Sequence, residues 1–173
     1  MLAPLRVRGA AVINLHSFNY FTDGEVPYSG LVEGPGRILY GTTFQGGSQG
    51  YGVVYDVTTN GGINTLYDFT NGVDGAFPQA GLVLANDGNF YGCTVEGGTN
   101  NTGVIFKITP GGAFTPLYSF SAQVEDNPDG AYPAANLIQA TDGYLYGTAS
   151  TGGANDSGTI FRISLSGAFQ TVY

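Results

Sequence analysis

Short apolar runs alternate along the chain with clusters of glycine, asparagine, aspartate and proline, and this pattern predicts β-strands joined by tight turns. Four such runs lie in the middle of the chain, at 80–85, 89–94, 103–109 and 114–120. The first two are separated by Asn-Asp-Gly at 86–88, which is a strong hairpin signal, and the last two by Pro-Gly-Gly at 110–112. We therefore predict four short antiparallel strands in this segment.

The same order of runs and turns occurs three times, so an internal repeat is the main signal in the sequence. The dipeptide Tyr-Gly on the second run occurs at 40–41, 91–92 and 146–147, which places the copies 51 and then 55 residues apart. Twelve aligned positions hold the same residue in all three copies. The four extra residues of the third copy lie between 120 and 129, and an insertion confined to one stretch indicates a surface loop.

A unit of four short strands repeated about every 50 residues is typical of a β-propeller blade. We therefore predict an all-β protein with three four-stranded antiparallel blades, at about 27–69, 78–120 and 133–173. An extra outer strand is predicted over 12–18, because this segment aligns with the fourth strand of the blades. Residues 1–11 are predicted to be an unstructured start or linker before the repeat domain, which fills the rest of the chain.

Three blades do not readily close a ring, since propellers typically have four to eight. An open stack exposes apolar faces at both ends, which soluble proteins avoid. We therefore expect the chain to be completed either by association with another copy or by the remainder of a longer propeller. Two copies related by a twofold axis would make six blades.

Composition agrees with this fold and excludes several functions. The 29 glycines among 173 residues are more than twice the average usage of about 7%, and 18 of them fall in six invariant positions of the repeat. Five Lys and Arg against 13 Asp and Glu give a net charge of −8, which disfavours binding to nucleic acid or to an anionic membrane. No apolar run is long enough for a transmembrane helix. The single cysteine, Cys93, is unable to form an internal disulfide and is predicted to be a small strand residue.

The repeat resembles a known family. Its clearest copy reads Asp-Gly-Tyr-Leu-Tyr-Gly-Thr at 142–148, then Gly-Gly at 152–153 and Gly-Thr-Ile-Phe at 158–161. These motifs are similar to the GloVer repeat, named for Gloeobacter and Verrucomicrobia, over nearly the whole chain from about residue 13. The first copy departs from the pattern, with Gly-Arg at 36–37 in place of Asp-Gly. The resemblance implies an extracellular bacterial repeat module, and it implies no catalytic residues.

Recurring carboxylates are the first candidates for chemistry. Asp23, Asp74 and Asp129 each precede a glycine and would suit a repeated metal or sugar site. The alternative, which we favour, is a turn in which the carboxylate accepts hydrogen bonds from backbone N–H groups. No calcium-loop pattern is present, and we predict no metal, cofactor or catalytic site. His16 is the only histidine, and it aligns with a tyrosine in the other copies.

Carbohydrate binding between blades is the leading alternative to a scaffold. The candidate ligand-binding residues are Tyr40, Tyr91 and Tyr146 on the second strand, with Asn100 and Asn155 in loops. Each of these tyrosines precedes a glycine, however, and a ring packed over a residue without a side chain favours the core between blades.

We therefore expect a non-catalytic extracellular or cell-surface module, a structural or adhesive scaffold that self-associates, with a glycan as an alternative partner. A second alternative is an enzyme that acts on polysaccharides. That chemistry needs two carboxylates about 5–10 Å apart, and the candidates are Glu33 and Glu96, two acids that do not repeat between the copies.

Overall fold

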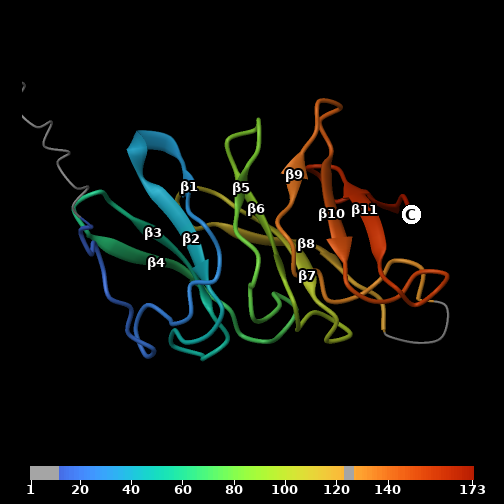
Figure 1. Ribbon diagram of the computed structural model, residues 1–173, viewed down its shortest axis with the longest axis horizontal. Helices are drawn as coiled ribbons and strands as arrows, with labels where there is room; N and C mark the ends of the chain where they lie inside the picture. The colour runs from blue at the N-terminus through green and yellow to red at the C-terminus, as the bar shows by residue number, and fades with distance from the viewer. Residues whose placement is uncertain (1–11, 123–126) are drawn as a thin grey trace, which may run out of the picture.

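The computed structural model describes residues 12–122 and 127–173, so the predicted unstructured start at 1–11 lies outside the described residues. Three four-stranded antiparallel sheets follow one another along the long axis of the molecule (Figure 1). The first sheet contains β1 (Val32–Glu33), β2 (Leu39–Thr43), β3 (Val53–Val57) and β4 (Ile63–Asp68). The second sheet contains β5 (Val83–Leu84), β6 (Phe90–Thr94), β7 (Val104–Ile108) and β8 (Phe114–Ser119). The third sheet contains β9 (Ile138–Gln139), β10 (Leu145–Ala149), β11 (Thr159–Ile163) and β12 (Phe169–Thr171).

Within each sheet the strands pair in chain order, so the prediction of three repeated antiparallel units is confirmed. In the second sheet β6 pairs with β7 from Phe90 opposite Ile108 to Thr94 opposite Val104. The pairing of the third and fourth strands shifts at the same place in the first and second sheets, after Val54 and after Ile105. The repeat in sequence is therefore also a repeat in register.

The first strand of the second unit is shorter than predicted. The apolar run 80–85 contributes only Val83–Leu84 (β5) to the ladder. Gly81 N donates instead to Asn136 Oδ1 of the following unit, at 2.7 Å. Part of this run therefore bonds to the segment before β9 in the next unit and not to β6.

The prediction of an outer strand at 12–18 is wrong, because these residues form no strand (Figure 1). Phe18 does contact Tyr55 at 5.0 Å between ring centroids, as Phe69 at the end of β4 contacts Phe106 at 5.4 Å. The segment thus lies where a fourth strand would lie. A fourth strand pairs with the third strand of its own sheet. Among the described residues no such strand lies beside segment 12–18, so its backbone has no strand with which to pair.

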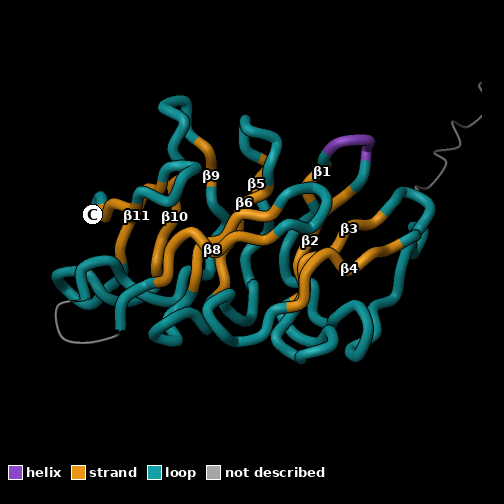
Figure 2. The backbone as a smooth tube through the Cα atoms, turned by 180° about the vertical axis from the view of Figure 1, so that it is seen from behind, coloured by secondary structure: helices purple, strands orange, loops and turns teal. Residues whose placement is uncertain are grey.

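Helix plays almost no part in the described residues. Pro35–Arg37 forms one 3-10 turn between β1 and β2, in the copy that departs from the Asp-Gly hairpin (purple in Figure 2). Within 12–122 and 127–173 there is no helix with the length and hydrophobicity to cross a membrane. The hairpin turns after β5 and β9 lie on one edge of the molecule, and the crossovers between sheets lie on the opposite edge (Figures 1 and 2).

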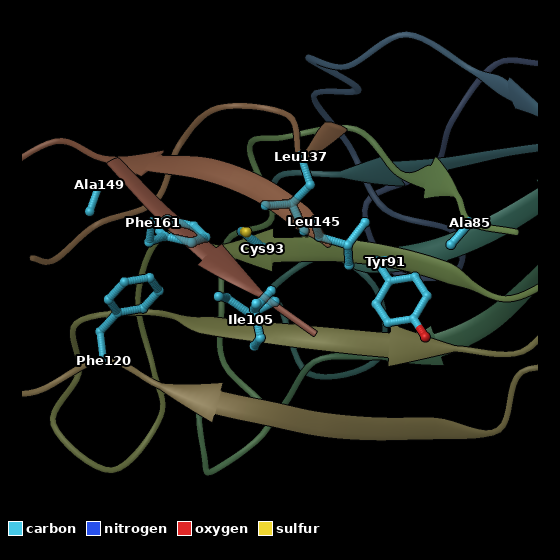
Figure 3. Packing of buried hydrophobic residues seen from close by; sticks show 10 residues of the cluster. Ala85, Tyr91, Cys93, Ile105, Phe120, Leu137, Leu145, Ala149 and Phe161 are labelled. Carbon is cyan, nitrogen blue, oxygen red and sulfur yellow. The ribbon is translucent and has the colours of Figure 1, made fainter. Parts of the chain in front are cut away.

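Most of the core in the described residues lies in two apolar layers, one between each pair of neighbouring sheets, and a third cluster on the outer face of the first sheet contains Val53, Tyr55 and Val57. We call the face of a sheet that points toward the following sheet its C-side face, and the opposite face its N-side face. Tyr40 on the C-side face of the first sheet packs on Phe90 of the second, with ring centroids 4.2 Å apart. In the second layer, Tyr91, Cys93 and Ile105 lie against Leu145 and Phe161 of the third sheet (Figure 3).

Glycine on each second strand is covered by an aromatic ring, although not by the tyrosine beside it. A Cβ built on Gly92 would lie 2.6 Å from Cζ of Phe106 on the neighbouring strand, and a Cβ on Gly147 would lie 2.5 Å from Cζ of Phe161. The ring over glycine therefore belongs to the N-side face, while the tyrosine points to the C-side face.

Tyr55 occupies the position of Phe106 and Phe161 in the first sheet, and burial raises its pKa to about 12. In an unfolded chain a tyrosine ionises near pH 10. The neutral ring therefore stabilises the fold fully below about pH 10, and this contribution is lost as the pH rises from about 10 to 12. We predict that Tyr55→Phe will weaken the loss of stability over this range.

Urea unfolding of the two proteins at neutral pH and at several alkaline pH values checks this prediction. At pH 7 the variant is expected to stay within about 1 kcal/mol of the natural chain, because phenylalanine already fills this position in the other two sheets. Tyr28→Phe, at an exposed ring, is the control. Parallel curves for the natural chain and Tyr55→Phe would contradict the expectation.

Candidate functional site

The recurring aspartates hold the crossovers that connect one sheet to the next. Asp74 Oδ2 accepts hydrogen bonds from the Tyr67 hydroxyl at 3.0 Å and from Thr70 N at 2.8 Å. In the next crossover, Asp129 Oδ2 accepts from the Tyr118 hydroxyl at 2.5 Å and from Ser121 N at 2.9 Å. Both aspartates are buried. These contacts support the interpretation as a turn, because each carboxylate binds groups of its own crossover.

His16, the only histidine in the sequence, lies in the first crossover where Tyr67 and Tyr118 lie in the next two, each beside the recurring aspartate. His16 Nε2 lies 2.7 Å from Asp23 Oδ2, and Asn19 N donates to Asp23 Oδ1. Burial, together with the nearby Asp74 carboxylate, raises the pKa of Tyr67 to about 12. The three pairs are therefore structural equivalents, and the contact that His16 makes with Asp23 holds the first crossover.

The three candidate tyrosines have different surroundings although their local sequences match. Tyr40 and Tyr91 are buried by the following sheet, which leaves neither ring accessible to a ligand. The Tyr91 hydroxyl donates to Asp87 Oδ2 at 2.9 Å, and burial together with this contact raises the pKa of Tyr91. Tyr146 makes the matching bond to Asp142 at 2.8 Å, but its ring is only partly covered. The structure therefore does not assemble the three rings into equivalent sites.

The candidate asparagines lie in matching loops. Asn100 Nδ2 donates to the Phe120 carbonyl at 2.9 Å, so its amide holds the end of β8. Asn155 is exposed, and its carbonyl accepts a hydrogen bond from Ser157 Oγ at 3.0 Å. Of the five candidate residues, Tyr146 and Asn155 are thus the two whose side chains reach solvent and neither fill a layer between sheets nor hold the end of a strand.

The two acid candidates lie in different units of the repeat. Glu33 lies in β1 of the first sheet, whereas Glu96 lies after β6 and pairs through its backbone with Ala76. Cys93 is buried, and burial raises the pKa of its thiol, which keeps it protonated at neutral pH. Over the part of the chain that the structure describes, no three His, Cys, Asp or Glu side chains gather as metal ligands.

The C-side face of the third sheet has no sheet packed on it among the described residues, and we call it the end face. Ile160 is 43% exposed there, whereas its equivalents Val54 and Ile105 are fully buried under the next sheet. Thr148 is likewise exposed where Thr42 and Cys93 are buried. The end face consists of Ile138, Tyr146, Thr148, Ile160, Val172 and Tyr173.

The opposite end of the stack has a complementary opening. On the N-side face of the first sheet, Leu31 is exposed where Leu82 and Leu137 are buried. A hollow of about 300 Å³ lies beside it, lined mainly by apolar side chains of the first sheet and of segment 12–18. The sequence predicted that both ends of the stack are apolar, but not which residues form them. The repeat alignment could have indicated these residues, because a position that is buried between two sheets in one copy is expected to be exposed in the copy at an end of the stack.

A family model describes this repeat. The model of the Gloeobacter/Verrucomicrobia repeat matches residues 4–173. The chain belongs to the Gloeobacter/Verrucomicrobia repeat family. This membership confirms the resemblance inferred from the motifs. The matched residues include all three sheets of this repeat protein. A search of curated proteins finds no match.

Proposed function

We propose that this Gloeobacter/Verrucomicrobia repeat chain is a non-catalytic extracellular or cell-surface module, a structural or adhesive scaffold that self-associates through its end face. The observation that carries the proposal is the exposure of Ile138, Thr148 and Ile160, whose equivalents in the first and second sheets lie in the layers between sheets. Apolar surface of this kind is stabilised by being covered.

The sheets are, in this proposal, blades of a β-propeller. Three observations support that arrangement: sequential strand order within each sheet, face-to-face packing of successive sheets, and a repeated crossover from the fourth strand of one sheet to the first strand of the next. Two copies joined at their ends would supply six blades, within the usual range for a closed ring.

The polar groups of the repeat support a scaffold more than an enzyme or a lectin. Asp74 and Asp129 are committed to crossovers, and Tyr40 and Tyr91 to the layers between sheets. A site repeated in every unit, as in a lectin that binds between blades, would need these same rings to be accessible. An extracellular position is part of the proposal because the repeat resembles extracellular modules and the composition is acidic, with a single lysine.

The proposal predicts that the natural chain associates and that Ile160→Asp prevents it. A carboxylate in an apolar interface is expected to weaken association by about a hundredfold or more. Light scattering over a range of concentrations, in salt high enough to screen the net charge of −8, gives the mass of each protein.

The control is Val73→Asp, at a side chain that is 71% exposed in the crossover between the first and second sheets. This variant is expected to behave as the natural chain does. A natural chain that stays at 18.0 kDa over the whole concentration range would refute the proposal.

A further inference from the structure

Segment 15–18 occupies the place of a fourth strand that precedes the first sheet. A Cβ on Gly61 would lie 2.3 Å from the Leu15 carbonyl oxygen. The equivalent positions repeat this approach, since a Cβ on Gly112 would lie 3.0 Å from Leu66 O and a Cβ on Gly167 would lie 3.2 Å from Leu117 O. Leu66 and Leu117 belong to β4 and β8, the fourth strands of the first and second sheets.

Two side-chain contacts also match between segment 12–18 and the fourth strands of the sheets. Phe18 packs on Tyr55 as Phe120 packs on Phe161, with ring centroids 5.0 and 5.4 Å apart. The His16–Asp23 pair repeats the tyrosine–aspartate pairs of the other crossovers. The segment is therefore anchored to the first sheet by the contacts that join a fourth strand to the sheet after it.

What the segment lacks is a sheet of its own. Among the described residues, 12–18 pair with no strand, and Val12, Ile13 and Leu15 are exposed. The third sheet has the opposite lack, because among the described residues no sheet covers its end face.

We infer that the end face is covered by the first sheet of a second copy, joined head to tail, and that segment 12–18 of that copy pairs with β11 in place of β12. This inference rests on the proposed self-association and specifies its geometry. It extends to a new pair of sheets the interface that already joins the first sheet to the second and the second to the third. Segment 12–18 and β12 align with the same strand, so only one of them fits against β11.

The register follows from the sheets that are complete. Val54 of β3 lies opposite Tyr67, and Ile105 of β7 lies opposite Tyr118. His16 aligns with these tyrosines and Ile160 with Val54 and Ile105. In the head-to-tail pair, His16 of one copy therefore lies opposite Ile160 of the other. In the single chain this position is filled by Tyr173, whose backbone exchanges two hydrogen bonds with Ile160.

Other contacts of the internal interfaces have counterparts at the new one. Thr42 Oγ1 donates to the carbonyl of Ala80 in the second sheet at 3.1 Å. The equivalent atoms are Thr148 Oγ1 of one copy and the Ser29 carbonyl of the other. Phe77 N and Tyr132 N donate across the two internal interfaces, to Tyr51 O and Thr102 O, each at 2.9 Å. The end face thus offers polar groups at matching places as well as apolar ones.

Cysteine cross-linking tests the inference on the full chain. His16→Cys and Ile160→Cys are made as separate proteins, each with Cys93→Thr, which removes the native thiol with the residue that the other two copies carry at that position. Opposed strand residues lie within the Cα separation of about 4.4–6.8 Å that a disulfide requires. After mixing and mild oxidation, we expect a disulfide-linked heterodimer, and no dimer from either protein alone.

The outcomes separate this inference from the proposed function. Disulfide-linked dimers of Ile160→Cys alone would mean that two end faces meet each other, and would overturn the head-to-tail arrangement. Association by light scattering without any cross-link would overturn the strand exchange and leave self-association standing. A chain that remains monomeric would overturn both. Circular dichroism of each variant, matched to the Cys93→Thr parent, establishes that the proteins are folded.

Discussion

Replacing Phe106 with alanine is expected to lower the free energy of unfolding by about 3–5 kcal/mol. Its ring is fully buried on the N-side face of the second sheet. It contacts Phe69 from the first sheet at 5.4 Å and Phe114 on the neighbouring strand at 5.2 Å between ring centroids. It also covers the bare backbone of Gly92. Truncation therefore opens a cavity that borders two sheets at once, and neither can move into it independently.

Urea unfolding followed by circular dichroism measures this effect. Phe21→Ala is the control, because its side chain is 77% exposed in the first crossover and its loss is expected to change stability by less than about 0.5 kcal/mol. Equal destabilisation by the two variants would mean that Phe106 does not hold the sheets together. A fall of about 1 kcal/mol or less in Phe106→Ala alone would lead to the same conclusion.

Gly97→Ala is expected to be the second most damaging of these changes, at more than about 3 kcal/mol. Gly97 has a φ of 74°, and a Cβ there would lie 2.5 Å from the Cα of Gly75 in the crossover. The obstacle is backbone, so no side-chain rotation relieves it. The same approach recurs in the third unit, where a Cβ on Gly152 would lie 2.7 Å from the Cα of Gly130. These glycines let the loop after each second strand touch the crossover before it.

Gly88→Ala separates the cost of the clash from the cost of the backbone angle. Gly88 has a φ of 78°, close to that of Gly97, but a Cβ there meets nothing within 4 Å. We expect a cost of about 1–2 kcal/mol at Gly88, from the left-handed conformation alone. The difference between the two variants in the free energy of unfolding measures the loop–crossover contact. A difference near zero would show that this contact does not constrain the fold.

Much of the fold was predictable because the determining interactions are local. Asn-Asp-Gly at 86–88 sets a turn, and the runs on either side of it alternate to two faces of a sheet. Comparison of the three copies also predicts that Asp74, Gly92 and Phe106 have the same structural role in every unit, because equivalent residues occur at the same spacing in each copy. The assignment of the aspartates to turns followed from the same logic, because the groups that bind Asp74 lie within seven residues of it.

The candidate ligand residues were less predictable, because exposure depends on what lies opposite. Tyr91 and Tyr146 share the local sequence Tyr-Gly and the same bond to an aspartate, yet one is buried and the other is half-covered. The difference is the presence of a following sheet. For the same reason 12–18 has the sequence of a fourth strand but forms none, because backbone pairing needs a partner that local sequence does not supply.

The sequence by itself determined the number of units, the order of their strands and the positions at which only glycine fits. The tertiary structure decided which copies of each aromatic position are enclosed and which form the end face. It also decided that segment 12–18 stays unpaired beside the first sheet. The physical reason is that turns and strand patterns arise from neighbours in the chain, whereas burial and pairing arise from neighbours in space.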